Sequence, residues 1–269
     1  MRPAELINMI YFSYLVVMAW VRPLSAGKRL KATIAGLAAI CLFWSMRFIG
    51  QYLAFLPSSI IRDWLPAPLF LVAYWTAGLY FTAPSEKLQS RLMRFDRRVL
   101  GRIHPAGIPR IAAACLELAY LLCYPLLPLG LVALYIARLG RCADAFWTVV
   151  LPAVYLCFAA LPFARTLPPR ILAEAGEPVL PPTKIREFNL WILRYGSIRV
   201  NTFPSAHVAT AFSVSLVLLY LLPLAGIVFL GVSVCIAIAV VLGRYHYAAD
   251  ALIGAAIAMA IFLIFLMLR

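Results

Sequence analysis

The stretch NTFPSAHVATAFSVSLVLLYLL, residues 201–222, sets several polar side chains directly before a long apolar run. A transmembrane helix needs about 20 predominantly apolar residues, and the run approaches that length. The whole chain shares this character, since 65% of its 269 residues are hydrophobic and only 13% are charged, whereas a soluble domain is nearer half apolar. The sequence therefore predicts an integral membrane protein in which His207 stands at the start of a span.

Comparable apolar runs recur along the whole chain. Their approximate ranges are 6–21, 32–51, 65–83, 111–137, 145–163, 205–222, 225–243 and 246–268. A helix satisfies its own backbone hydrogen bonds in lipid, which an isolated strand does not. We therefore expect an all-α fold, a polytopic transmembrane helix bundle with about eight spans.

The segment SEKLQSRLMRFDRRVLGRIHPAG, residues 85–107, separates the third and fourth runs. Its apolar residues recur every three or four positions, and arginines fill much of the rest, as in a basic amphipathic helix that lies along lipid headgroups. We expect three parts: N-terminal transmembrane helices (1–84), this interfacial helix (85–110), and a transmembrane core that carries the polar motifs (111–269).

Three further polar residues have simpler interpretations. Arg47, near the end of the second run, can reach the interface with its charged group. Glu117 lies inside the fourth run, where a carboxyl group is costly, so it must pair, line a wet cavity or be protonated. His104, at the end of the basic helix, is interpreted as an interfacial residue without a role.

Residues 164–203 form the longest polar connection, and they are basic. Arg165, Arg170 and Lys184 lie in this connection, which leads directly to Asn201. Long connections within a compact domain are commonly functional. We therefore include these four residues among the candidates for a binding site.

Two histidines far apart in sequence are expected to meet. His207 begins the sixth run, His246 begins the eighth, and the two apolar passes between them return the chain to the same membrane face. Arg170 precedes the sixth run and lies on that face as well. The membrane itself should bring these three side chains to one level.

The start of the sixth run suggests an anion site. Pro204 suits the first turn of a helix, which would put Thr202 or Phe203 at its cap. The backbone N–H groups from Ser205 to His207 would then be free, and such groups at a helix N-terminus bind anions. The Ser205 hydroxyl would add another donor.

The second histidine has the surroundings of a nucleophile. On a helix, His246 and Asp250 would share a face because they are four residues apart. The aspartate would accept the Nδ1 proton and leave the Nε2 lone pair available for attack. Arg244 would supply a charged fork for phosphate oxygens. A buried hydrogen bond that merely joins two helices is the alternative, and a metal site lacks a clear fourth ligand.

These motifs resemble the type-2 phosphatidic acid phosphatase superfamily. PSAH (204–207) and GRYHYAAD (243–250) are similar to its second and third motifs, and ARTLPPR (164–170) stands where the first, basic motif belongs. Ala206 and Gly243 replace a glycine and a serine of the family pattern. The arginine two residues before the histidine, with Tyr247 after it, is similar to the branch that contains inositol-phosphorylceramide synthases.

The resemblance implies a role for each residue. His246 would attack phosphorus and form a phosphohistidine, Asp250 would orient it, and His207 would protonate the leaving alkoxide and then activate water or an alcohol. No cofactor and no metal is implied. The residues implied to bind the phosphorylated substrate are Arg165, Arg170, Lys184, Asn201, Ser205 and Arg244.

The expected activity is therefore hydrolysis of a lipid or polyisoprenoid phosphate or diphosphate. Transfer of a phosphoryl headgroup to a lipid or sugar alcohol is the alternative enzyme, and a lipid transporter, which would favour inverted repeats, is the other class. The net charge of +14 is explained by anionic lipid rather than by nucleic acid. The sequence carries no signal for an oligomeric state.

The membrane placement rests on charge. We expect a multi-pass protein of the plasma or inner membrane. Basic connections on the active-site side place that side in the cytoplasm by the positive-inside rule, whereas the resemblance implies an outer or lumenal site.

Overall fold

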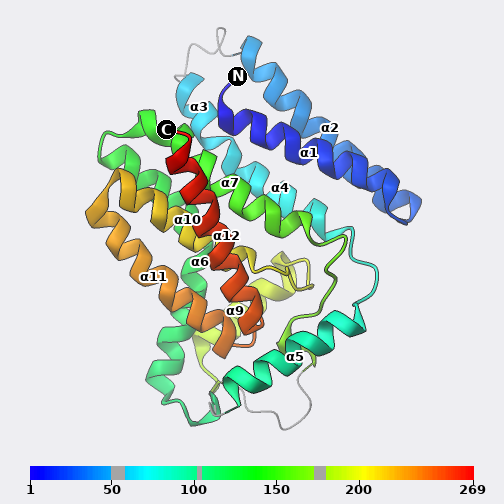
Figure 1. The fold of residues 1–269 in the computed structure, drawn as a ribbon, viewed down its shortest axis with the longest axis vertical. Coiled ribbons are helices and arrows are strands. Elements are labelled where there is room, and N and C mark those ends of the chain that lie inside the picture. The colour runs from blue at the N-terminus through cyan, green and yellow to red at the C-terminus, as the bar shows by residue number, and fades with distance from the viewer. Residues whose placement is uncertain (50–57, 102–104, 173–179) are drawn as a thin grey trace.

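The computed structural model describes residues 1–49, 58–101, 105–172 and 180–269. Helices dominate these ranges and no strand occurs in them, so the predicted all-α bundle is confirmed (Figure 1). Six of the helices found in the described ranges are long and apolar enough to span a membrane. They are α1 (Pro3–Val21), α2 (Ala26–Ile49), α6 (Arg110–Ile136), α7 (Ala143–Ala159, whose span begins with the 3-10 turn at Gly140), α11 (Pro223–Leu242) and α12 (Ala248–Met267).

The other two expected spans correspond to shorter helices. The third run forms α4 (Pro66–Gly78), with 13 residues, after the short α3 (Ser58–Trp64), and the sixth forms α10 (Ala206–Leu221), with 16 residues. A count of eight spans therefore stays a prediction, as does the division at residues 84 and 110. Two 3-10 turns, Pro105–Gly107 and Gly140–Cys142, precede α6 and α7.

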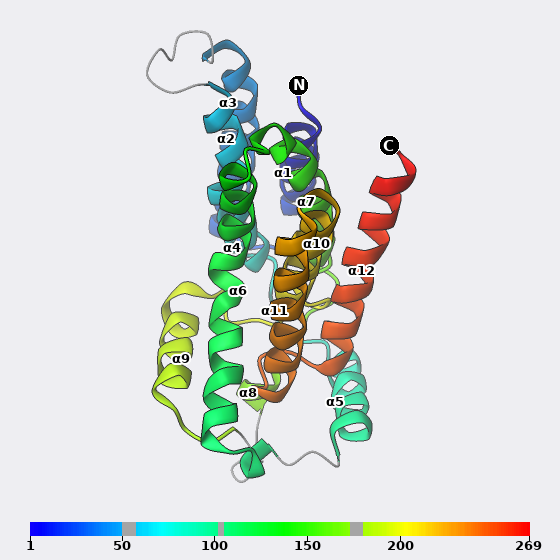
Figure 2. The same ribbon diagram turned by 90° about the vertical axis from the view of Figure 1, so that its left-hand side faces the viewer.

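Helix α10 lies at the centre of the bundle. It packs against α6, α7, α11 and α12 (Figure 2), and most of its residues are buried. Its small residues let neighbouring helices approach closely: the Ser215 hydroxyl lies 2.6 Å from that of Ser233 on α11. This central position fixes the start of α10, where His207 lies.

The two ends of the bundle differ in character. At one end, where both termini lie (Figure 2), Arg2 pairs with Asp63 and Arg62 with Glu5. Tyr135 also donates to Asp63, at 2.6 Å, so this polar cluster ties α1, α3 and α6 together. The opposite end carries the polar connections that the sequence singled out.

Two amphipathic helices lie at that opposite end. The basic segment forms α5 (Glu86–Leu100), which confirms the expected amphipathic helix. The 164–203 connection was expected to be a loop, which is wrong in part, because it contains α9 (Lys184–Gly196) and the short α8 (Pro169–Leu172). Thr183 caps α9 by accepting from the Arg186 N–H, a start signal hidden among neighbouring prolines. The expectations for the Arg47 side chain and for His104 lie outside the described residues.

Candidate active site

The starts of α10 and α12 are packed together. The Ser205 N–H donates to the Asp250 carbonyl oxygen at 3.0 Å. A methyl group on Gly254 would lie 2.5 Å from the Ser205 carbonyl oxygen, so only glycine allows this approach. As predicted from the two apolar passes between them, His207 and His246 meet at one end of the bundle.

The two histidines and Asp250 form a linear chain. His207 Nδ1 lies 3.0 Å from His246 Nε2, and His246 Nδ1 lies 3.2 Å from Asp250 Oδ2. An ionised carboxylate only accepts hydrogen bonds, so the proton of His246 belongs on Nδ1. The Nε2 lone pair then faces His207, whose Nδ1 carries the proton of this contact.

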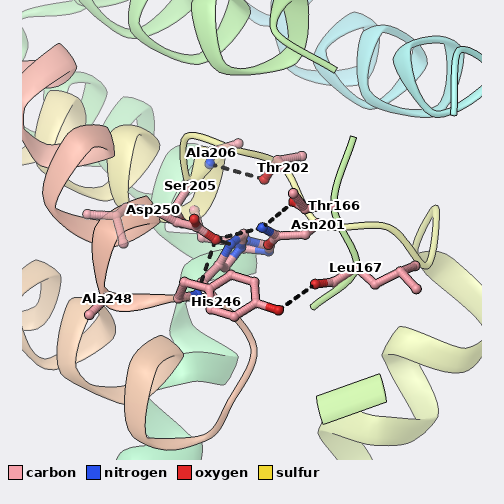
Figure 3. Close-up of polar contacts among 12 residues, drawn as sticks. Thr166, Leu167, Asn201, Thr202, Ser205, Ala206, His246, Ala248 and Asp250 are labelled. Carbon is pink, nitrogen blue, oxygen red and sulfur yellow. Dashed lines mark hydrogen bonds and ion pairs between the residues drawn. The ribbon is translucent and has the colours of Figure 1, made fainter. Parts of the chain in front are cut away.

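Asp250 is held by three donors on a single oxygen. Besides His246, the Asn201 amide donates to Oδ2 at 2.7 Å and the Tyr247 N–H at 3.1 Å (Figure 3). Asn201 is itself fixed by donating to Thr166 Oγ1 at 2.9 Å. Asp250 Oδ1 is buried without a partner, so all of the orientation acts through Oδ2.

Arg170 is the predicted arginine that reaches the histidines. It lines a small cavity, about 20 Å³, together with His207, His246 and Tyr245. Its backbone N–H donates to the Arg244 carbonyl at 3.0 Å, and its guanidinium lies 5.7 Å from the Tyr245 ring centroid. A phosphoryl group would have to displace side chains to enter so small a space.

The other predicted cations lie outside that cavity. Arg165 donates to Thr82 instead, and Lys184 is exposed at the start of α9. Arg244 has a left-handed backbone (φ 61°) where the chain turns from α11 toward His246. In the structure, none of these three side chains borders either of the two cavities at the histidines.

The expected anion site at the start of α10 is wrong in detail. Ser205, not Thr202 or Phe203, is the N-cap, and its hydroxyl accepts from the Val208 N–H. The Ser205 N–H is used by Asp250, and the Ala206 N–H points at Thr202 Oγ1 at 3.4 Å. Two of the three N–H groups that were expected to bind an anion, those of Ser205 and Ala206, are therefore used within the protein.

A second, larger cavity begins at His207. Its volume is about 460 Å³, and its lining is mainly apolar. It lies between α4, α6, α7, α9 and α10, with Phe70, Leu127, Phe158 and Tyr74 on its walls. Tyr74, Leu193, Ser197, Thr202 and His207 border both cavities, so the apolar space and the polar space adjoin beside His207.

Glu117 pairs, which was one of the three options expected for it. Arg186 Nη1 lies 2.5 Å from its Oε1, and Asn189 and the Tyr245 hydroxyl donate to Oε2 at 2.8 and 2.6 Å. Burial raises the pKa of Tyr245, and the nearby Glu117 carboxylate raises it further, which keeps this hydroxyl a donor. The network anchors α9 beside the cavities.

Several contributors were missed at the sequence level. Tyr245 stacks on Tyr120 with ring centroids 3.8 Å apart, and Tyr120 lies 5.7 Å from the His207 ring. Gln89 and Asp96 of α5 contact the residues that follow His246. The position of Tyr245, directly beside His246, was a usable signal, whereas Tyr120 looks like any aromatic residue of an apolar helix.

Comparison with known families gives one decisive result. The model of the PAP2 superfamily matches residues 91–264, well over half of the chain. The chain belongs to the PAP2 superfamily. The resemblance read from residues 164–170, 204–207 and 243–250 is thereby confirmed, and this PAP2 chain is an integral membrane protein of a phosphatase-like enzyme family. Searches of curated proteins and of solved structures gave no match.

Proposed function

We propose that the protein hydrolyses a lipid or polyisoprenoid phosphate or diphosphate through a phosphohistidine on His246. The observation that carries the proposal is the chain of contacts Asp250–His246–His207, at 3.2 and 3.0 Å. It supplies an oriented nucleophile and a second ring able to move a proton. Arg170 beside them supplies positive charge for phosphoryl oxygens.

The reaction runs in two steps. His246 Nε2 attacks phosphorus while the P–O bond to the lipid breaks, and His207 gives a proton to the departing alkoxide. His207 then takes a proton from water, which attacks the phosphohistidine and releases inorganic phosphate. Asp250 stabilises the positive charge that the His246 ring carries while it is phosphorylated.

The apolar cavity supports a lipid as substrate. It begins at His207, the residue that would face the leaving oxygen, and extends along α4 and α6. A chain attached to that oxygen would be buried there at a gain of about 0.8 kcal/mol per methylene. An acceptor alcohol with a long chain would fit the same space, which is why headgroup transfer remains the second candidate.

The test is an assay of purified protein in detergent against a panel of lipid phosphates and diphosphates. We expect free phosphate to be released from at least one of them, and an acid-labile, base-stable phosphoenzyme to accumulate early in turnover. His246→Ala should abolish both signals while thermal stability stays close to that of the wild type. Activity in a folded His246→Ala protein would refute the mechanism.

The same assay separates hydrolysis from transfer. With a lipid or sugar alcohol present, a phosphatase still releases phosphate, whereas a transferase passes the headgroup to the alcohol. Headgroup transfer without phosphate release would replace the first candidate by the second. It would also favour the inositol-phosphorylceramide synthase branch, to which Arg244 and Tyr247 are similar in spacing.

We further propose the plasma or inner membrane as the location, with the site on the cytoplasmic side. Lys28, Arg29 and the exposed arginines of α5 belong to the site end of the bundle, and the positive-inside rule favours that orientation. Hydrolysis of a membrane-impermeant substrate by sealed vesicles that expose only the cytoplasmic side supports the orientation. Hydrolysis only by vesicles of opposite orientation refutes it.

A further inference from the structure

Helix α5 has two opposite faces. Lys87, Arg91, Arg94 and Arg98 recur at steps of four, three and four, so they form one stripe along the helix, and all four are exposed. Buried Gln89 and Leu92, together with partly buried Asp96, lie roughly half a turn away, on the face that meets the bundle. The basic stripe of α5 therefore points away from the protein.

The inner face of α5 contacts the segments on either side of the proposed nucleophile. The Gln89 side chain donates to the Tyr247 hydroxyl and to the Leu167 carbonyl, and its Oε1 accepts from the Leu167 N–H at 2.8 Å. Tyr247 directly follows His246, and Leu167 lies three residues before Arg170. A single side chain of α5 thus joins the two segments that carry the nucleophile and the phosphate-binding arginine.

Asp96 makes the second contact. Its Oδ1 accepts from the Ala248 N–H at 2.8 Å, and Ala248 is the first residue of α12. The first N–H groups of a helix have no partner within it, so Asp96 caps α12 from another helix. The two residues that follow His246 are consequently both held by α5.

The outer face of α5 suits an anionic lipid surface. The helix lies at the end of the bundle where α12 begins (Figure 1), and Phe95 and Val99, which are 37% and 50% exposed, flank the basic stripe. Apolar residues beside a row of cations are typical of helices that lie at the headgroups of anionic membranes. Each cation near such a surface strengthens binding by about fivefold.

We propose that α5 docks on anionic phospholipid headgroups through its basic stripe, and that Gln89 and Asp96 transmit this docking by ordering the segment that carries His246. Gln89 and Asp96 are then positioning residues, since they act through Tyr247 and Ala248. Only the activity arm of the test rests on the proposed hydrolysis.

The test uses the full-length protein in nanodiscs of phosphatidylcholine alone or mixed with phosphatidylglycerol. Hydrogen exchange is followed in peptides that cover residues 86–100 and 243–252. We expect the anionic lipid to slow exchange in both segments and to raise turnover of a lipid phosphate. Identical exchange in the two membranes would overturn the proposal.

Two pairs of variants separate docking from transmission. Arg91→Gln/Arg94→Gln should weaken docking about 25-fold and remove the lipid-dependent slowing of exchange in both 86–100 and 243–252. The matched control is Arg138→Gln/Arg141→Gln, whose residues are exposed at the other end of the bundle, and it should keep both effects. Asp96→Ala should leave the lipid response of 86–100 intact, remove that of 243–252, and speed exchange at the start of α12 about fivefold.

Asp96→Asn is the rescue variant, because its amide oxygen still accepts from Ala248. It should restore the lipid response of 243–252. If Asp96 only filled space, replacing it would change exchange equally in the two membranes. An unchanged response in Arg91→Gln/Arg94→Gln, or a failed rescue by Asp96→Asn, would overturn the proposal. A normal exchange pattern without activity on any lipid phosphate would refute the proposed hydrolysis and leave the docking intact.

Discussion

Asp250→Asn tests whether His246 needs a negative charge or only an acceptor. All three donors to Asp250 reach Oδ2, and Oδ1 has no partner. An asparagine can therefore place its oxygen among the donors and its amide nitrogen where Oδ1 lies. His246 keeps its Nδ1 proton and its orientation, so the substitution removes the charge and little else.

The expected loss follows from the geometry. The His246 ring becomes positive when Nε2 bonds to phosphorus, and its Nδ1 lies 3.2 Å from Oδ2. Two unit charges about 4 Å apart attract by about 4 kcal/mol at an effective dielectric constant of about 20. Losing that attraction in the transition state corresponds to a fall of about a thousandfold in rate.

Asp250→Ala is the comparison that makes the result interpretable. It leaves one N–H of the Asn201 amide and the Tyr247 N–H without an acceptor, and each unpaired buried donor costs about 1–3 kcal/mol of stability. We expect Asp250→Asn to unfold near the wild-type temperature in detergent and Asp250→Ala to unfold clearly earlier. Stopped-flow measurement of phosphoenzyme formation gives the rates. Full activity of Asp250→Asn, or equal destabilisation of both variants, would refute the reasoning.

Three further predictions address the cavity, α5 and the second histidine. Ala67 lines the apolar cavity on α4, so Ala67→Trp should partly fill it. The variant should raise KM for long-chain substrates by about fourfold per excluded methylene and leave KM for short-chain substrates unchanged, whereas Ala38→Trp on the exposed face of α2 should change neither. Equal effects on both chain lengths would contradict the cavity assignment. Burial, and more weakly the nearby Asp250, raises the pKa of Asp96 to about 6, against the opposing effects of Ala248 and Arg244. The contribution of Asp96 to stability is therefore full below about pH 4 and lost as pH rises through about 6. The melting temperature measured across this pH range should show the loss in the wild type but not in Asp96→Asn. His207→Ala should slow phosphoenzyme formation from an alkyl phosphate by about 100- to 10,000-fold but from a nitrophenyl ester far less, because that leaving group needs no proton; equal losses would show that His207 is not the acid.

The sequence was sufficient for the parts of the site that the membrane dictates. The runs at 205–222 and 225–243 fold as two antiparallel helices, so the start of α10 and the start of α12 share one end. His246 and Asp250 do meet, but the helical spacing predicted for them is wrong, because His246 lies in the turn before α12, whose N-cap is Tyr247. The number of apolar passes decides which residues share one end of the bundle, and that number can be read from one sequence.

The partners of the arginines could not be predicted in this way. Arg165 and Arg244 lie in irregular connections, where no periodicity indicates which way a side chain points, and Lys184 begins α9, a helix that the sequence did not predict. The structure directs Arg165 to Thr82 and leaves Lys184 exposed. Arg186, by contrast, is fixed on Glu117 because α9 folds back along α6, a packing that depends on residues far apart in sequence.

The contact between the two histidines also affects whether His246 is accessible before a substrate binds. At 3.0 Å, His207 Nδ1 and His246 Nε2 are hydrogen-bonded, so no phosphorus atom fits between them. A phosphoryl group has to break this bond in order to reach the nucleophile, and the same movement frees the His207 proton for the leaving oxygen. Because His207 lines both the apolar cavity and the small polar one, a lipid chain that fills the apolar cavity lies against the ring that must move. In the proposed mechanism, substrate binding and exposure of the nucleophile are therefore one event, and a phosphate ester without a long chain should be turned over more slowly than one with a long chain.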